Sequence, residues 1–205
     1  CMAGELSGAM PRQNNNFLEA LSEAIKSEFY GKFNLSEALK GANVFLEQET
    51  KSGNVNWLGN LNFAVIHIKD SILNFTKVGD VKILLLRDGE FLDISQNLEL
   101  QDQEPYPLKV FSNIAFGKLS SQDKILIVTR EIFSAISKNE AILNQLSQIT
   151  KEKELDNIFR QNKETVSNVS GVCLLITDGN GQSQTALPNI RFMPKIISKK
   201  NIWLT

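Results

Sequence analysis

The sequence is poor in the side chains that build disulfide frameworks and soft-metal sites. Among 205 residues it has two cysteines, Cys1 and Cys173, and one histidine, His67. Two cysteines so far apart indicate no disulfide framework, and such sparse cysteine is typical of a reducing compartment. One imidazole and two distant thiols also cannot assemble a zinc site from local spacing.

Net charge, long apolar runs and nucleotide-binding motifs are lacking as well. The net charge is −1, which gives no overall field to attract nucleic acid or acidic lipid. No run of about 20 apolar residues is present, so no transmembrane span is predicted within the sequence. Neither a Gly-x-Ser-x-Gly nucleophile turn nor a Gly-rich phosphate loop occurs. What remains is an ordinary globular composition, 42% hydrophobic and 22% charged, sufficient for one domain or two small ones.

Three short apolar runs between residues 60 and 95 have the composition of strands. Val, Ile, Leu and Phe dominate them, and such residues suit a pleated, half-buried surface. The runs are Phe63–Ile68, Ile72–Val78 and Val81–Leu86. The turn sequences Lys69-Asp70-Ser71 and Arg87-Asp88-Gly89-Glu90 predict tight hairpins. Gly79 indicates a bulge or a close backbone approach, and the whole segment is predicted to be an antiparallel meander.

Helical patterns flank this segment on both sides. Apolar residues recur every three or four positions in residues 17–30 and 35–49, the second after a capping Asn34. Further helices are predicted near Lys138, after the capping sequence Ser137-x-x-Glu140, and within residues 151–163. Additional strands are predicted at residues 113–116, 124–128 and 171–177. Runs of strands beside runs of helices indicate an α+β fold with a largely antiparallel sheet.

Two features each allow two interpretations. His67 lies in the first predicted strand, where a packed core histidine is the commoner role and a metal ligand or general base is the alternative. The tail, residues 181–205, carries four basic residues and no acidic one. It is either a solvated terminus or a basic juxtamembrane segment that leads to a membrane tether beyond Thr205.

Several motifs form a recognisable set when they are taken in order. Two helices precede a strand that ends in Val78-Gly79-Asp80 and another that leads into Arg87-Asp88-Gly89. Downstream lie GKLSSQDKILIVT at 117–129 and SGVCLLI at 170–176. Over most of residues 17–177 this set resembles the metal-dependent protein phosphatases (the PPM, or type 2C, family). The resemblance implies a PPM-like α/β/β/α sandwich of two antiparallel sheets flanked by helix pairs. The chain supplies most of this sandwich, with its first strands either present or missing.

The chemistry that this resemblance implies needs carboxylates that the sequence lacks. In the family, acidic residues hold two divalent ions, which activate water against a phosphoester. The metal-binding Thr-Asp-Gly position has Thr129-Arg130-Glu131 here, and a guanidinium stays protonated. The Asp-Asp position has Ser170 and Gly171. The family's early Asp-Gly is not visible in a chain that starts at Cys1.

Acids close to these positions do not replace the lost ligands. Asp123 aligns with a structural turn, Glu131 would need a shifted backbone, and Asp80 is interpreted as a turn and packing residue. One or two displaced carboxylates do not hold two hard cations against their hydration. Arg130 is either a contact for a phosphate or acidic partner group, or a charge that fills the former metal pocket by pairing with an acid.

The sequence therefore predicts a degenerate member of this family, a pseudophosphatase domain of bacterial type with a regulatory, partner-binding or scaffolding role. Residues 1–16 are expected to be loop or a truncated N-terminal part, 17–180 the phosphatase-like domain, and 181–205 the basic tail. No catalytic residue, metal ligand or cofactor is expected; the partner is a protein, not nucleic acid. The expected location is cytoplasmic, with the cytoplasmic face of a membrane as an alternative. The alternative function is a Mn- or Mg-dependent serine/threonine-type phosphatase with an altered active site.

Overall fold

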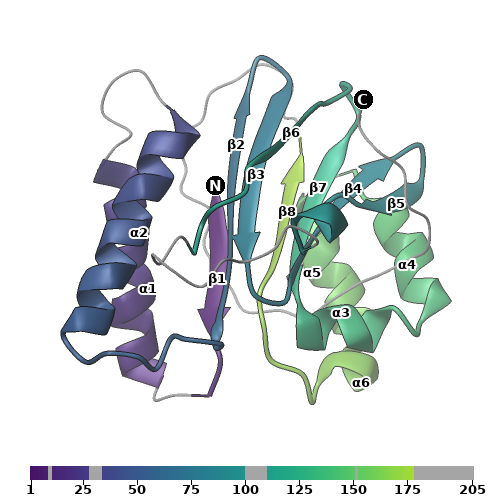
Figure 1. The fold of residues 1–205 in the computed structure, drawn as a ribbon. Coiled ribbons are helices and arrows are strands. Elements are labelled where there is room, and N and C mark those ends of the chain that lie inside the picture. The colour runs from purple at the N-terminus through teal and green to yellow at the C-terminus, as the bar shows by residue number, and fades with distance from the viewer. Residues whose placement is uncertain (9–10, 28–33, 100–109, 151, 178–205) are drawn as a thin grey trace. The chain divides into compact units, whose positions relative to one another are not determined.

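The computed structural model describes residues 1–8, 11–27, 34–99, 110–150 and 152–177 (Figure 1). These residues form two compact units that are described separately. The first contains residues 1–79 and 97–117, and the second contains residues 80–96 and those from 118 onward. Within the described residues, no helix combines the length and the hydrophobicity that crossing a membrane requires.

The first unit consists of a four-stranded sheet and two helices. Its strands lie in the order β1-β2-β3-β6, and both β1–β2 and β2–β3 are antiparallel pairs. The elements are β1 (Met2–Leu6), α1 (Pro11–Lys26), α2 (Leu35–Lys51), β2 (Leu61–Lys69), β3 (Ile72–Val78) and β6 (Ala115–Lys118).

The second unit pairs another four-stranded sheet with four helices. Its order is β5-β4-β7-β8, and every pair is antiparallel. The elements are β4 (Val81–Arg87), β5 (Glu90–Asp93), β7 (Lys124–Thr129), α3 (Arg130–Ile136), α4 (Glu140–Ser147), α5 (Glu152–Gln161), α6 (Lys163–Val166) and β8 (Cys173–Thr177). A 3-10 helix, η2 (Gln96–Glu99), follows β5.

The core of the first unit joins both helices to one face of the sheet. Leu21 and Ile25 of α1, one turn apart, and Leu39 and Leu46 of α2 are buried in it. Such spacing places apolar side chains on a single helix face. The side chain of Asn34 caps α2 by accepting a hydrogen bond from the Ser36 N–H at 2.9 Å, as the sequence predicted.

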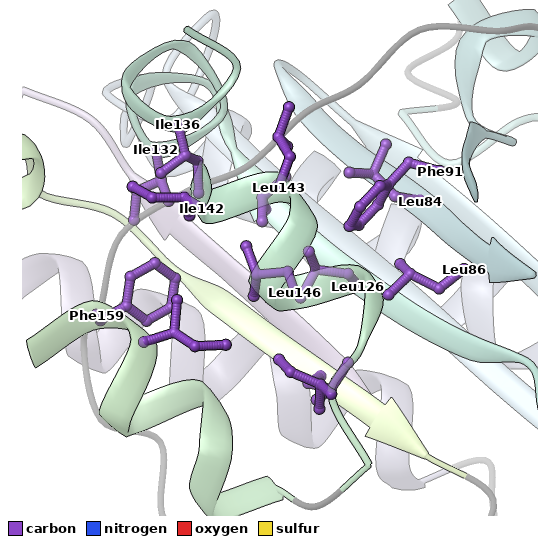
Figure 2. Close-up of a cluster of buried hydrophobic side chains, with 14 of the residues drawn as sticks. Leu84, Leu86, Phe91, Leu126, Ile132, Ile136, Ile142, Leu143, Leu146 and Phe159 are labelled. Carbon is purple, nitrogen blue, oxygen red and sulfur yellow. The ribbon is translucent and has the colours of Figure 1, made fainter. Parts of the chain in front are cut away.

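The core of the second unit forms where helices α3 to α5 meet β4, β7 and β8. Figure 2 shows strand residues such as Leu84 and Leu126 facing Ile132, Ile142 and Leu146 of the helices. β7, whose buried run was predicted at residues 124–128, lies between two other strands and is buried over nearly its whole length. Burial on both faces explains why its apolar residues run on without alternation.

The two predicted hairpin turns are confirmed, but the predicted meander is wrong. Asp70 and Ser71 have φ of 51° and 60°, and Asp88 and Gly89 have 52° and 79°, the signature of primed two-residue turns. However, β3 and β4 belong to different sheets. The chain leaves the first sheet at Gly79, whose φ is +70° and where a Cβ atom would lie 2.3 Å from the Leu61 carbonyl oxygen. In the first sheet β3 is flanked by β2 and β6, whereas β4, the next strand in the sequence, belongs to the second sheet.

Residues 1–16, interpreted as loop, contain a strand and the start of a helix. β1 pairs with β2 over Met2–Leu6, and α1 begins at Pro11, so three consecutive asparagines are helical. Asparagine favours turns locally, but here Asn14 is buried and its Nδ2 donates to the Leu6 carbonyl at 2.9 Å. Tertiary packing overrides the local preference.

Two helix boundaries also differ from the sequence prediction. The predicted cap Ser137 ends α3, and Asn139 caps α4 by accepting from the N–H groups of Ala141 and Ile142. The sequence did not predict α3 or the short β5. α3 follows β7 without any intervening residue, so no turn signal marks its start. The tail, residues 181–205, lies outside the described residues.

Candidate functional site at one end of the second sheet

Three of the sequence positions singled out above meet at one end of the second sheet. Val81, at the start of β4, lies opposite Thr129, at the end of β7. The N–H of Thr129 donates to the Val172 carbonyl at 3.1 Å, and the N–H of Val172 donates to Thr129 Oγ1 at 3.1 Å. Asp80, Arg130 and Gly171 are the direct sequence neighbours of Val81, Thr129 and Val172, and they are the three positions that meet here. We call this the Arg130 end of the sheet.

Thr129 is the residue that ties β7 to the approach to β8. It occupies the N-cap position of α3 but makes no side-chain cap bond, because its hydroxyl accepts the Val172 N–H instead. Its side chain is buried. Arg130 is therefore the first residue of α3, and its own side chain is exposed.

Arg130 and Asp80 form an ion pair across this end. Arg130 Nη1 lies 2.9 Å from Asp80 Oδ2, and their side chains are 69% and 61% exposed. A pair this open to water contributes at most about 1 kcal/mol to stability. Electrostatically it places a fixed positive charge where the resemblance expects a metal-binding carboxylate.

Gly171 is enclosed by its neighbours at the position where the resemblance expects an aspartate. A Cβ atom added there would lie 2.3 Å from Thr129 Oγ1 and 2.8 Å from the Ile132 side chain. Real Cβ atoms do not approach other atoms so closely, so any side chain forces the surroundings to move. Ser170, the residue before it, is exposed. The packing of this segment thus has no room for a carboxylate at Gly171.

Asp123 lies at the opposite end of β7 and has a structural role. Arg87 donates to it through Nε at 3.0 Å and Nη2 at 2.5 Å, and the Ser120 N–H donates at 2.7 Å. Burial alone would raise the pKa of Asp123. Arg87 lowers it through hydrogen bonds and its positive charge, the Ser120 N–H lowers it through a hydrogen bond, and together these effects outweigh burial, so the pKa is lowered. The sequence interpretation of Asp123 as a turn residue agrees with this geometry.

The remaining candidate residues are described by their own surroundings. Glu131 follows Arg130 on α3 and is exposed. His67 belongs to the first unit, half-buried in β2 opposite Asn74, and burial is the main cause that lowers its pKa. Cys173 begins β8, and burial raises the pKa of its thiol, which disfavours the thiolate needed for metal binding or nucleophilic attack.

The donor set at the Arg130 end does not fit a pair of divalent cations. Mg²⁺ and Mn²⁺ require several oxygen ligands, whereas the carboxylate of Asp80 at this end is already paired with a guanidinium. Among the residues that the structure describes, no three His, Cys, Asp or Glu side chains are grouped so as to hold a metal ion. These residues therefore do not supply the ligands of the two-metal centre that the resemblance implies.

The sequence identified the residues at this end but not the contact between them. Asp80 directly precedes an apolar run and Arg130 directly follows another. Those two positions meet only if the two runs pair antiparallel in the observed register. Thr129 was not singled out, and its sole sequence signal is its place at the end of a buried run.

Solved structures of a bacterial regulatory protein and of two serine/threonine phosphatases share the fold of this chain. PppA, "a key regulatory component of T6SS in Pseudomonas aeruginosa", is 12% identical with a TM-score of 0.60, covering 85% of this chain and 83% of its own. The catalytic domain of PstP in complex with two manganese ions is 14% identical, with a TM-score of 0.58 and coverage of 85% and 84%. The S. agalactiae serine/threonine phosphatase is 18% identical, with a TM-score of 0.56 and coverage of 85% and 84%.

These likenesses define the class of fold. No protein-family model and no curated protein sequence matches the chain. The two antiparallel sheets with their helices are nevertheless the α+β fold of the metal-dependent, PPM-type phosphatases, as the sequence predicted. Identities of 12–18% establish the fold alone.

Proposed function

We propose that this chain is a non-catalytic protein-phosphatase-like domain with a regulatory, partner-binding or scaffolding role. The observation that carries the proposal is the ion pair between Arg130 and Asp80, because it holds a guanidinium where the resemblance expects a metal-binding carboxylate. The close packing around Gly171 supports it, because no ligand side chain fits there. PppA, which shares the fold, is named as a regulatory component, and this supports a regulatory use of the scaffold.

Manganese binding is the direct test of this proposal. A site of micromolar affinity at about 1 mM manganese would stabilise the protein by about 4 kcal/mol, which corresponds to a rise of about 8–16 °C in Tm. We expect a rise of less than about 1 °C, no heat of binding in calorimetry, and no hydrolysis of p-nitrophenyl phosphate. Micromolar binding of two ions would overturn the proposal.

The alternative is a Mn- or Mg-dependent serine/threonine-type phosphatase with an altered site, favoured by the shared fold with manganese-bound PstP. It predicts metal-dependent hydrolysis that changes when Arg130→Asp supplies a carboxylate beside Asp80. The non-catalytic proposal predicts that Arg130→Asp remains inactive, since Gly171 still offers no second ligand. The two functions are thus separated by one variant and one substrate.

Arg130 is our candidate for contact with a phosphate or acidic group of a protein partner. Its guanidinium is exposed, and a planar fork binds phosphate bidentately. Titration with a phosphoserine peptide, followed by NMR of the arginine Nε–H signals, should shift Arg130 and lose that response in Arg130→Gln. Arg160→Gln is the matched control, because Arg160 is equally exposed and also faces an aspartate, Asp156, at 3.7 Å. If the Nε–H signals of Arg130 and Arg160 shifted equally with the peptide, Arg130 would not be a specific phosphate contact.

The cytoplasmic location and the membrane tether remain predictions from the sequence. The basic tail and whatever follows Thr205 lie outside the described residues. Fractionation of cells that express the full-length protein, with and without the segment after residue 180, tests both predictions.

A further inference from the structure

The first unit contains a pocket that the proposed function does not use. Its volume is about 390 Å³, and its walls come from α1, α2 and the loop after α2. Ligand pockets in proteins begin at about 300 Å³, so this one has room for a single small molecule. Its polar lining consists of side-chain amides and one carboxylate: Gln13, Asn14, Asn16, Glu49, Asn54 and Asn56.

The amides on α1 are costly for the helix and are not all used by the fold. Asparagine is a poor helix former because its side chain competes for backbone hydrogen bonds. Asn14 has a structural role through its hydrogen bond to Leu6. Gln13 and Asn16 lie one turn apart on the pocket face, and in the described part of the chain their side chains have no hydrogen-bond partner. Their donors and acceptors are available to a ligand.

The opposite wall is held in place by its own hydrogen bonds. Asn54 Nδ2 donates to Glu49 Oε2 at 2.5 Å, which fixes the carboxylate at the pocket. The Asn56 carbonyl accepts from Asn60 Nδ2 at 2.9 Å, which fixes the loop. A wall whose side chains are already positioned loses less conformational entropy when a ligand binds.

The apolar part of the lining includes two phenylalanine rings, and the described lining side chains include no cation. Phe17 and Phe45 lie with ring centroids 5.6 Å apart. Among the lining side chains that the structure describes, none is a lysine or an arginine, so none of them would offset the charge of a phosphate or carboxylate ligand. The single carboxylate of Glu49 would repel such an anion.

We propose that this pocket binds a neutral, polyhydroxylated small molecule of the saccharide class. Hydroxyl groups both donate and accept hydrogen bonds, as side-chain amides do, and a carboxylate accepts from hydroxyls. The C–H face of a sugar ring is apolar and packs against aromatic rings. An amine would use Glu49 but leave the amide N–H donors of Gln13 and Asn16 without acceptors.

Trp57 provides a direct reporter for this pocket. It is buried and stacks on Phe17 with ring centroids 6.5 Å apart and an interplanar angle of 18°. Trp203 is the only other tryptophan, so Trp203→Phe in the full chain leaves a single emitter. Glucose, galactose, N-acetylglucosamine, maltose and cellobiose are titrated, with inorganic phosphate and ethylamine as comparison probes. We expect a saturable change in emission with at least one sugar and none with phosphate or ethylamine.

Paired variants localise the response. Asn16→Ala and Glu49→Gln should each weaken sugar binding roughly two- to tenfold, as expected for the loss of one hydrogen bond. Asn15→Ala is the matched control, because Asn15 is in the same helix, is exposed and does not line the pocket; its affinity should equal that of the parent. Ligand-detected saturation-transfer NMR repeats the measurement without fluorescence.

Any one of three results would overturn the proposal. The first is no saturable signal from any of the sugars by either method up to about 50 mM, a concentration beyond that of weak specific binding. The second is an equal loss of affinity in Asn15→Ala and Asn16→Ala. The third is binding of phosphate or ethylamine that depends on Asn16 and exceeds that of every sugar.

Discussion

β4 and β7 are joined at both ends by an arginine–aspartate pair, and the two pairs differ in their surroundings. At one end Arg87, the last residue of β4, contacts Asp123, which precedes β7. At the other end Asp80, which precedes β4, contacts Arg130, which follows β7. The Asp123 side chain is 2% exposed and receives three hydrogen bonds, whereas the Asp80 side chain is 61% exposed.

The difference in burial gives the two pairs different roles. The pair at Asp123 also uses the Lys118 carbonyl, which accepts from Arg87 Nη2 at 3.2 Å, so it orders the turn that enters β7. The pair at Asp80 joins two exposed side chains across the end of the sheet. The first pair is therefore part of what maintains the fold, and the second is open to solvent, as the proposed partner contact of Arg130 requires.

Removing the Asp123 charge should have the largest effect on stability. Asp123→Asn leaves Arg87 partly buried without its carboxylate, and we expect a loss of about 2–4 kcal/mol in the free energy of unfolding. Urea denaturation followed by circular dichroism measures it. The matched variant Asp80→Asn should cost less than about 1 kcal/mol. Equal costs would abolish the distinction between the two pairs.

A substitution at Gly171 tests whether the Arg130 end is closed by packing. Gly171→Ala places a methyl group against Thr129 Oγ1 and Ile132, so overpacking should cost about 1–3 kcal/mol. Ser170→Ala, one residue earlier and exposed, should change stability by less than about 0.5 kcal/mol. Thermal unfolding of both variants gives the comparison. A neutral Gly171→Ala would mean that a ligand side chain fits there after all.

The ion pair of Asp123 should also make the free energy of unfolding depend on pH. Because the folded state lowers the pKa of Asp123, this carboxylate stabilises the protein fully above its unfolded pKa, near 4. The contribution is lost as pH falls below about 4 and through the lower folded pKa. The stability difference between the parent and Asp123→Asn should therefore be constant from about pH 5 to 7 and shrink in more acid solution. A difference that grew below pH 4 would contradict this sign.

The smallest expected effect is the coupling between Asp80 and Arg130. A double-mutant cycle with Asp80→Asn and Arg130→Gln should give less than about 1 kcal/mol, since both partners are exposed. Added salt should reduce it further through screening. A cycle on Arg87 and Asp123, measured under the same conditions, should keep most of its coupling in salt.

Local signals in the sequence were sufficient for some elements and insufficient for others. Asn34 was recognised as a cap, and the turn at Asp88-Gly89 was recognised as a hairpin, because each depends on neighbouring residues alone. β1 was missed because its five residues have no periodic pattern and it forms only by pairing with β2. The three asparagines of α1 predicted a loop, since the packing that keeps them helical involves residues distant in sequence.

The candidate site shows the same division. The prediction that Arg130, Ser170 and Gly171 occupy the ligand positions of the resembled family required only the motifs. That Arg130 faces Asp80, and that Gly171 has no space for a side chain, depends on the register of β4, β7 and the segment before β8.

The sequence by itself determined most of the strands, the hairpin turns and the residue types at the positions where the resemblance expects acidic ligands. Side-chain alternation, turn residues and the charge of a guanidinium are properties of short segments. Only the tertiary structure decided which strands share a sheet and which charges meet at its ends. Strand partners are chosen by contacts between residues some 50 positions apart, such as Val81 and Thr129, and local patterns do not encode that choice.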